Sequence, residues 1–179
     1  MLNDFEKVLI SKSELQDKIK LLADQISKDY EGKNPLFVGI LKGSVLFMSD
    51  LLRELSTPCQ MEFMSVSSYG TSTKSSGEVK LIKDLNVPIS DKHVIIVEDI
   101  VDSGNTLSYL KRLLLQRNPK SVKICTLLDK PDRRKVELDV DYVGFKIPDE
   151  FVVGYGLDYN EDYRQYPEVY ILKREVYEK

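Results

Sequence analysis

The chain has 179 residues, 42% of them hydrophobic, which is enough to bury a sizeable core, and we expect one domain spanning residues 1–179. Its formal net charge of −3 argues against nucleic-acid binding as the main function. The chain has no apolar run of membrane-spanning length and no secretion signal, and Cys59 and Cys125 lie far apart, so we expect reduced thiols in a cytoplasmic protein that binds no membrane.

The first predicted helix begins near residue 11 and is followed by a buried strand. Ser11 and Glu14 have the spacing of a capping box, and a helical stripe follows at Leu15, Ile19, Leu22 and Ile26. Residues 36–41 (LFVGIL) are typical of a strand buried on both faces. Lys42 and Gly43 come next, before a second helical stripe. They indicate either an anion site, since glycine allows close backbone approach and lysine supplies charge, or an ordinary turn.

A polar segment separates the next two predicted strands. Residues 61–66 (MEFMSV) are expected to form a strand, and residues 79–81 resemble another. Between them, residues 67–78 are rich in Ser, Thr and Gly and have little to bury. We expect a mobile flap at 67–78 that excludes water from a reaction, unless it is only a hairpin tip.

The most informative stretch runs from His93 to Thr106 (HVIIVEDIVDSGNT). An apolar strand at 94–97 leads into the acids Glu98 and Asp99, and a small-residue loop then precedes a helix marked by leucines. The loop consists of Asp102-Ser103-Gly104-Asn105-Thr106. Free backbone N–H groups, two hydroxyls and the positive end of the helix dipole would stabilise a phosphate there.

The acids of this stretch need an explanation, because three carboxylates would repel a phosphate. A sugar phosphate with Mg²⁺ resolves the conflict, since its hydroxyls donate to carboxylates and the cation lies between like charges. The alternative is that Asp102 or Ser103 merely caps the helix while Glu98 and Asp99 are solvated at a strand end. The single His93 has no histidine or cysteine companion, so any metal should be held by oxygen rather than in a zinc site.

The remaining segments complete an α/β pattern. A strand at 121–128 ends in Asp129-Lys130-Pro131, the cluster Arg133-Arg134-Lys135 is interpreted as a solvated turn, and short strands are expected at 140–145, 151–155 and 169–172. Alternating strands and helices predict a doubly wound, mainly parallel sheet flanked by helices, with ligands bound at the carboxyl ends of its strands. That geometry gathers Lys42, the acids and Lys130 in one cleft.

With these residues assembled, the chain resembles the type I phosphoribosyltransferases, in their hypoxanthine-guanine branch. The segment VIIVEDIVDSGNT matches the family's phosphoribosyl pyrophosphate (PRPP) motif without departure. The purine 6-oxo branch is matched by LKGS, SSYG, LLDK and the long segment VGFKIPDEFVVGYGLDYNEDYR. The similarity runs from about residue 36 to residue 172, and it implies the type I fold with a small hood.

The resemblance also implies where PRPP binds. The loop 102–106 would hold the ribose 5-phosphate, with Glu98 and Asp99 on the ribose hydroxyls and on Mg²⁺. Asp102 would be the general base or acid at the purine imidazole. Lys42, Gly43 and Arg164 correspond to pyrophosphate contacts, together with Ser68 and Tyr69 of the flap. In the family a non-proline cis peptide often precedes the lysine.

The purine site is implied in the same way. Lys130 corresponds to the donor to the 6-oxo group, Phe151 to the residue that stacks on the base, and Val152 to a main-chain contact with the ring edge. Asp158, beside the purine, matches a carboxylate linked to Mg²⁺ at the pyrophosphate. Taken alone, Phe151 and Val152 also fit a buried strand, and Asp158 fits a plain turn.

We therefore expect transfer of 5-phosphoribosyl from PRPP to hypoxanthine or guanine, with little activity on adenine. Two alternatives remain: an enzyme of the same fold that prefers xanthine, and a PRPP-sensing regulator that binds nucleic acid. We also expect a homo-oligomer, a dimer or tetramer, with an interface among the carboxyl-terminal tyrosines Tyr163, Tyr166, Tyr170 and Tyr177.

Overall fold

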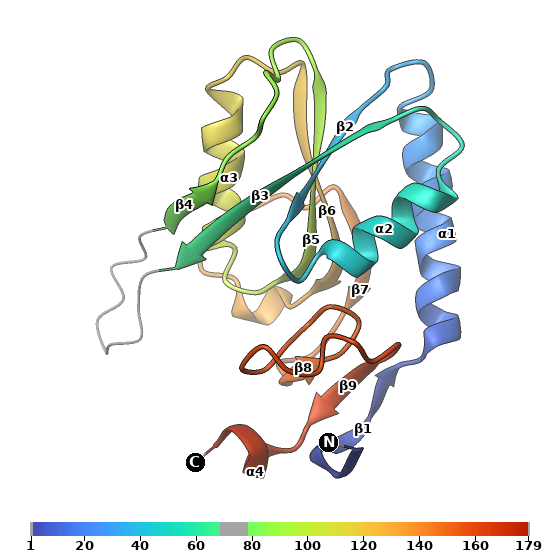
Figure 1. Cartoon of the computed structure of the whole chain (residues 1–179), viewed down its shortest axis with the longest axis vertical. Helices are drawn as coiled ribbons and strands as arrows, with labels where there is room; N and C mark the ends of the chain where they lie inside the picture. Colours follow the sequence, from blue (N-terminus) through green and yellow to red (C-terminus); the bar gives the residue numbers. More distant parts are fainter. Residues whose placement is uncertain (1, 69–78, 179) are drawn as a thin grey trace.

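A mainly parallel sheet forms the centre of the molecule in the computed structural model, which describes residues 2–68 and 79–178. Its six strands have the order β4-β3-β2-β5-β6-β7 (Figure 1). Their bounds are β2 Leu36–Ile40, β3 Gln60–Ser68, β4 Val79–Lys83, β5 His93–Val101, β6 Ser121–Asp129 and β7 Tyr142–Lys146. Only β4 runs antiparallel to its neighbour, so this part of the predicted fold is confirmed.

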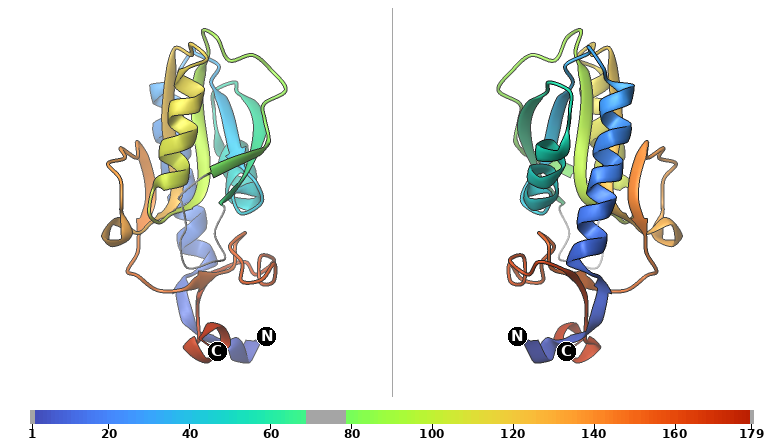
Figure 2. Two further views of the ribbon diagram at one scale, coloured as in Figure 1. Left: turned by 90° about the vertical axis from the view of Figure 1, so that its left-hand side faces the viewer. Right: turned by 90° about the vertical axis from the view of Figure 1, so that its right-hand side faces the viewer.

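Helices cover both faces of this sheet because successive strand residues point to opposite sides. One core joins α1 (Lys12–Asp29) and α2 (Val45–Glu54) to Phe37, Ile95 and Val97. The other joins α3 (Asn105–Leu115) to the alternate strand residues, which include Val38, Val94 and Ile96. Figure 2 shows α1 and α3 toward opposite sides of the molecule. The sheet is therefore doubly wound.

The connections place a topological switch point between β2 and β5. From β2 the chain moves to β3 on one side of it, and later returns to β5 on the other side. The loops that leave β2 and β5 consequently diverge at the carboxyl edge of the sheet and leave a crevice between them, where ligands bind in open α/β sheets. Both candidate anion loops predicted from the sequence follow these two strands.

A second, antiparallel sheet lies beyond this carboxyl edge, in the lower part of Figure 1. It has the order β1-β9-β8, with bounds Phe5–Ile10, Val169–Leu172 and Val152–Val153. The expected strand at 151–155 is shorter than predicted, since β8 consists of Val152 and Val153, and Gly154 forms an isolated bridge with Leu157. We call this sheet and its loops (residues 148–178 with 2–10) the hood; short helices η1 (Leu2–Asp4) and α4 (Arg174–Tyr177) belong to it, whereas η2 (Pro131–Arg133) follows β6.

Aromatic rings fill the hood. Phe5 stacks on Tyr170 with ring centroids 4.3 Å apart and meets Tyr163 and Tyr166 edge to face. Tyr163 also donates a 2.9 Å hydrogen bond to the Asp4 carboxylate. These tyrosines thus pack against one another within the chain, and the expected interface between subunits stays a prediction.

Two expectations from composition can be compared with the structure. Cys59 and Cys125 are free thiols, Cys125 being fully buried in the core that faces α1 and α2. Among the residues that the structure describes, no helix is long and apolar enough to span a membrane.

The predicted capping box is present at the start of α1. The Glu14 backbone N–H donates to Ser11 Oγ at 3.3 Å, and the Ser11 backbone N–H donates to Glu14 Oε2 at 2.8 Å. Ser11→Ala should therefore lower the free energy of unfolding by about 1 kcal/mol in urea denaturation. The control Lys20→Ala, exposed on the same helix, should change it by less than about 0.5 kcal/mol. Equal stability of Ser11→Ala and wild type would contradict this account of the helix start.

Candidate active site

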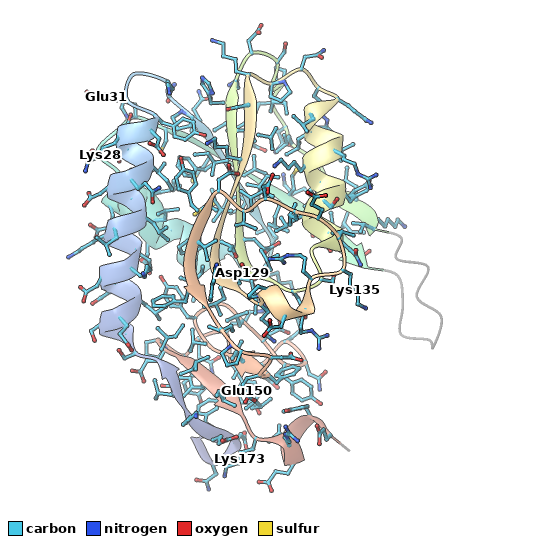
Figure 3. The ribbon with its side chains drawn as sticks, turned by 180° about the vertical axis from the view of Figure 1, so that it is seen from behind. Lys28, Glu31, Asp129, Lys135, Glu150 and Lys173 are labelled. Atoms are coloured by element: carbon cyan, nitrogen blue, oxygen red, sulfur yellow. The ribbon has the colours of Figure 1, made fainter. Side chains whose placement is uncertain are left out.

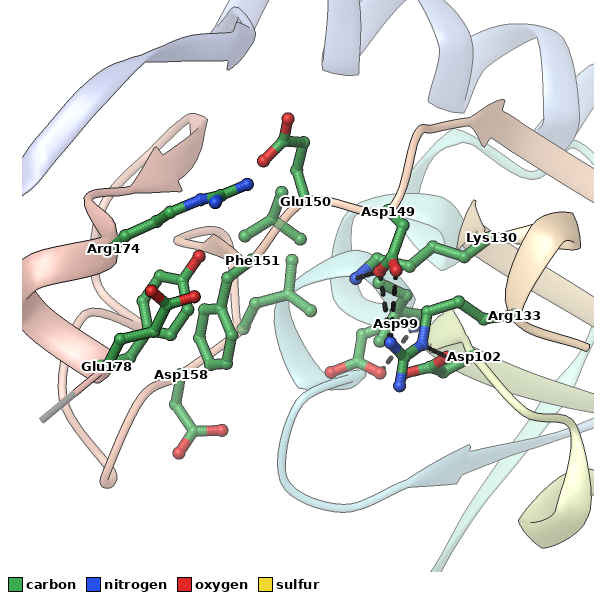
Figure 4. A pocket seen from close by; sticks show the side chains of 14 residues that line it. Asp99, Asp102, Lys130, Arg133, Asp149, Glu150, Phe151, Asp158, Arg174 and Glu178 are labelled. Atoms are coloured by element: carbon green, nitrogen blue, oxygen red, sulfur yellow. Dashed lines mark hydrogen bonds and ion pairs between the residues drawn. The ribbon is translucent and has the colours of Figure 1, made fainter.

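A cavity of about 540 Å³ opens between the carboxyl ends of β5 and β6 and the hood (Figure 4). Six of the residues singled out from the sequence line it, namely Asp99, Asp102, Lys130, Phe151, Val152 and Asp158. A smaller hollow of about 160 Å³ adjoins it, because Asp99 and Asp102 line both. The fold therefore brings together side chains that are 59 residues apart at the extremes, Asp99 and Asp158.

The acid pair lies within β5 rather than beyond its end, because the strand continues to Val101. Glu98 is only 9% exposed, so the alternative of two solvated carboxylates was wrong. Burial, together with the charge of Asp99, raises the pKa of Glu98 well above its usual range, and burial also raises the pKa of Asp99. Two crowded, desolvated carboxylates favour a proton, a hydroxyl donor or a cation beside them.

The loop 102–106 surrounds the smaller hollow and opens α3. Gly104 has φ +84°, a conformation that favours glycine, and it is the residue that precedes the helix. Gly104 at the N-cap has no side chain to cap the helix, and Asp102 makes no capping hydrogen bond among the described contacts, whereas Ser103 does accept one from the first helical N–H. Ser103, Gly104 and Thr106 line the hollow, whereas Asn105 does not, and its N–H donates to Ser103 Oγ at 3.3 Å. The hollow thus lies at the positive end of α3.

The loop after β2 packs tightly against both neighbouring segments. The Leu41–Lys42 peptide is cis, which agrees with what the resemblance implies. A side chain at Gly43 would collide with the Asp99 carboxylate, and one at Gly156 of the hood would collide with the Gly43 carbonyl oxygen. Because neither position has room for a Cβ atom, the two glycines let this loop contact the hood backbone on one side and the Asp99 side chain of β5 on the other.

The two candidate pyrophosphate cations share an acidic partner. Lys42 Nζ lies 2.7 Å from Glu161 Oε2, and Arg164 Nη2 lies 3.4 Å from Glu161 Oε1. Arg164 also pairs with Asp158 Oδ1 at 3.0 Å and donates to the Gly156 carbonyl oxygen at 2.7 Å. Lys42 and Arg164 are therefore brought to one carboxylate although 122 positions separate them in the chain.

Lys130 and Phe151 face the larger cavity from opposite sides (Figure 4). Lys130, at the end of β6, is 8% exposed, and burial lowers the pKa of its ammonium group. Its Nζ lies 3.8 Å from Asp149 Oδ1. Phe151 stacks on Tyr177 with centroids 4.7 Å apart, and Val152 is buried beside it in β8. The cavity thus combines a cationic donor with an aromatic wall.

The basic cluster at 133–135 is largely exposed, as a solvated turn would be, but its two arginines also make specific contacts with neighbouring acids. Arg133 Nε donates to Asp102 Oδ1 at 2.6 Å, and its Nη1 lies 3.3 Å from Asp149 Oδ2. Arg134 pairs with Asp129, at the end of β6 (Figure 3), and donates to the Asp102 carbonyl oxygen at 2.9 Å. These arginines bind the loop that carries Asp102 because opposite charges meet where β5 and β6 end.

Some predictions remain without a structural description. The flap residues 69–78, including Tyr69, and the side chain of Ser68 lie outside the described residues. In the described ranges 2–68 and 79–178, no three His, Cys, Asp or Glu side chains gather into a metal-holding group. The expected trio of Glu98, Asp99 and Asp158 is therefore not a ready-made metal site.

Sequence reasoning missed several residues of the cavity. Asp149, Glu150, Arg174 and Tyr177 line it, and nothing in their local pattern distinguishes them from surface residues. Arg133 carried a usable signal, since it follows Lys130 by three positions on the loop that leaves β6. Loops after parallel strands supply the ligand contacts in such sheets, so the basic cluster belonged on the list of candidates.

Comparisons with known proteins agree with this geometry. Residues 11–160 match the model of the phosphoribosyl transferase domain. The chain is 53% identical to the hypoxanthine-guanine phosphoribosyltransferase of Bacillus subtilis, over 99% of each chain. A crystal structure of a hypoxanthine phosphoribosyltransferase from Staphylococcus aureus superposes with a TM-score of 0.95 at 52% identity, covering 99% of this chain and 96% of that one.

A longer protein also contains this module. The chain is 58% identical, over 99% of its length, to the bifunctional protein TilS/HprT of Listeria monocytogenes, of which it spans only 27%. Full-length relatives, the matched domain and the fold all agree. The chain belongs to the phosphoribosyltransferases, in their hypoxanthine-guanine family.

Proposed function

We propose that this protein transfers the 5-phosphoribosyl group of PRPP to N9 of hypoxanthine or guanine, giving IMP or GMP and pyrophosphate. The observation that carries the proposal is the shared cavity, in which the carboxylate of Asp102, the ammonium of Lys130 and the ring of Phe151 surround one space beside an anion cradle. Relatives named hypoxanthine-guanine phosphoribosyltransferase over their full length support the same reaction.

PRPP would bind across the switch point between β2 and β5. The hollow at 103–106 suits the 5-phosphate, because backbone N–H groups, hydroxyls and the dipole of α3 all favour an anion. Glu98 and Asp99 would accept hydrogen bonds from the ribose hydroxyls, which offsets the crowding of the two carboxylates. The pyrophosphate would then reach Lys42, Gly43 and Arg164, with Ser68 and Tyr69 contributing from the flap.

The donor set fits Mg²⁺, a hard cation that prefers oxygen ligands. Glu98 and Asp99 would hold it near the ribose, and Asp158 near the pyrophosphate. Because these three carboxylates form no closed metal site by themselves, substrate oxygens would complete the coordination. Bound there, the ion supplies charge that stabilises the departing pyrophosphate.

In the transfer itself, the bond from ribose C1 to the pyrophosphate oxygen breaks and a bond from C1 to purine N9 forms. Lys42 and Arg164 stabilise the negative charge that grows on the pyrophosphate. Asp102 accepts the proton that the purine imidazole loses, so charge is balanced on both sides of the ribose. Arg133 donates to Asp102 Oδ1 and therefore orients the carboxylate toward the cavity.

Substrate choice would rest on Lys130, which donates hydrogen bonds and cannot accept them. A 6-oxo group satisfies this buried donor, whereas the 6-amino group of adenine leaves it unpaired. Phe151 stacks on the base and the Val152 backbone meets its edge. We further propose that residues 1–179 form one domain that works as a cytoplasmic homo-oligomer.

Asp102→Asn should lower kcat by about 10²- to 10⁴-fold, because an amide cannot accept the purine proton. PRPP affinity, measured by calorimetry, should change little, since the cradle of N–H groups is retained. Asp132→Asn is the matched control, because Asp132 is exposed on the neighbouring loop, and its kcat should equal that of wild type. Undiminished turnover by Asp102→Asn would remove this carboxylate from the chemistry.

A spectrophotometric assay with PRPP, Mg²⁺ and each of hypoxanthine, guanine, xanthine and adenine tests the substrate range. Wild type should use the first two and transfer little to adenine. Lys130→Gln, whose amide can accept as well as donate, should reduce the preference for hypoxanthine over adenine by at least about tenfold. Lys146→Gln, exposed at the end of β7, should leave that preference unchanged. Efficient use of adenine by wild type, or transfer to xanthine alone, would overturn the assignment.

Chelation of divalent cations with EDTA should stop transfer, and addition of Mg²⁺ should restore it. PRPP binding, followed by calorimetry without a purine, should weaken under the same treatment, because the carboxylates would again repel the substrate. Transfer and binding that are both indifferent to EDTA would exclude the proposed role of the metal.

A further inference from the structure

The carboxylate of Glu161 lies where the proposed function requires a pyrophosphate oxygen. Its Oε2 accepts a 2.7 Å hydrogen bond from Lys42 Nζ, and its Oε1 lies 3.4 Å from Arg164 Nη2. Each of its two oxygens thus meets one of the cations assigned to the leaving group. The hydrogen bond from Lys42 lowers the pKa of Glu161, so the side chain is an anion at neutral pH.

The chain around Glu161 holds the side chain in this position. Its backbone N–H donates to Asp158 Oδ2 at 2.9 Å. Its φ is +69°, a left-handed backbone conformation that residues other than glycine rarely adopt. Asp158 in turn pairs with Arg164, so one short loop supplies both the cation and the carboxylate that neutralises it. The Glu161 side chain itself is 64% exposed, so it can turn into solvent without disturbing the core, although the backbone of its loop stays in place.

The cations retain capacity for another anion. Arg164 Nε is buried and has no hydrogen-bond partner among the described residues, although Nη1 and Nη2 are both engaged. Lys42 carries three N–H donors, one of which donates to Glu161. A ligand with several oxygens, such as a pyrophosphate, can satisfy more of these donors than one carboxylate.

We propose that Glu161 is an internal competitor for the pyrophosphate subsite, a carboxylate that occupies Lys42 and Arg164 when the site is free and must withdraw when pyrophosphate binds. The proposal rests on the proposed function, since it assumes that these cations hold that group. Its consequence is that Glu161 weakens pyrophosphate binding and promotes release of the product. Most contact residues have the opposite effect, which makes the proposal easy to contradict.

The test is titration of the whole protein with inorganic pyrophosphate in the presence of Mg²⁺, by isothermal calorimetry. Glu161→Gln keeps the size of the side chain and its backbone conformation but removes the charge. It should bind pyrophosphate about fivefold more tightly than wild type, the gain expected from loss of an exposed ion pair. The KM for PRPP should also fall, because PRPP carries the same pyrophosphate group.

Two variants serve as controls. Asp162→Asn removes a negative charge from the neighbouring exposed position. Among the described contacts Asp162 forms no ion pair with Lys42 or Arg164, so this variant should leave the pyrophosphate affinity unchanged. In a Lys42→Gln background, Glu161→Gln should raise the pyrophosphate affinity less than it does in wild type, because one of the two cations that Glu161 contacts has already been removed. Thermal unfolding should show that all variants fold.

The outcomes separate this inference from the proposed function. Unchanged or weaker pyrophosphate binding by Glu161→Gln overturns the inference, even if wild type transfers phosphoribosyl groups normally. An equal gain in Asp162→Asn also overturns it, because a general loss of repulsion would then explain the effect. A wild-type protein that catalyses no transfer would contradict the proposed function, whatever the titration shows.

Discussion

The close approach of three chain segments at Gly43 is the constraint on which the site depends. The Asp99 carboxylate lies where a side chain at position 43 would have to go, and the Gly43 carbonyl oxygen lies where a side chain at position 156 would have to go. The loop after β2, the acids of β5 and the hood are therefore fixed relative to one another without any long side chain between them. A sugar with charged groups at both ends requires that precision, because a displacement of about 1 Å can lower the catalytic rate by about 10²-fold.

Charge pairing organises the rest of the crevice. Each cation assigned to a substrate group pairs with an acid of the chain: Lys42 with Glu161, Arg164 with Asp158, and Lys130 with Asp149. The candidate general base is paired as well, through Arg133. Substrate binding would therefore exchange one set of ion pairs for another. The cations of the site are never left without a counter-charge, which avoids the free-energy cost of isolated charges in a partly buried cavity.

The sequence predicted the central sheet and the position of the two candidate anion loops well, because their signals are local. Apolar runs such as 94–97 and the leucine stripe of α3 define elements by periodicity, and the strand–loop–helix order then places Lys42 and Asp102 at one edge. The hood was less predictable: β1 is mostly exposed, and its pairing with β9 joins residues more than 150 positions apart. Sequence reasoning missed Arg133 and Glu161 for a similar reason. Each contacts a partner that is distant in the chain, Asp102 for Arg133 and Lys42 for Glu161.

A crystal structure of the protein with IMP bound would test the central claim, that one crevice holds the phosphate, the ribose and the base together, most directly. The account predicts that the 5′-phosphate accepts hydrogen bonds from the backbone of residues 103–106, while the base stacks on Phe151 with its 6-oxo group at Lys130 Nζ and its imidazole at Asp102. A nucleotide bound elsewhere, or one that reaches the loop 103–106 but leaves Lys130 and Asp102 without contact, would contradict it.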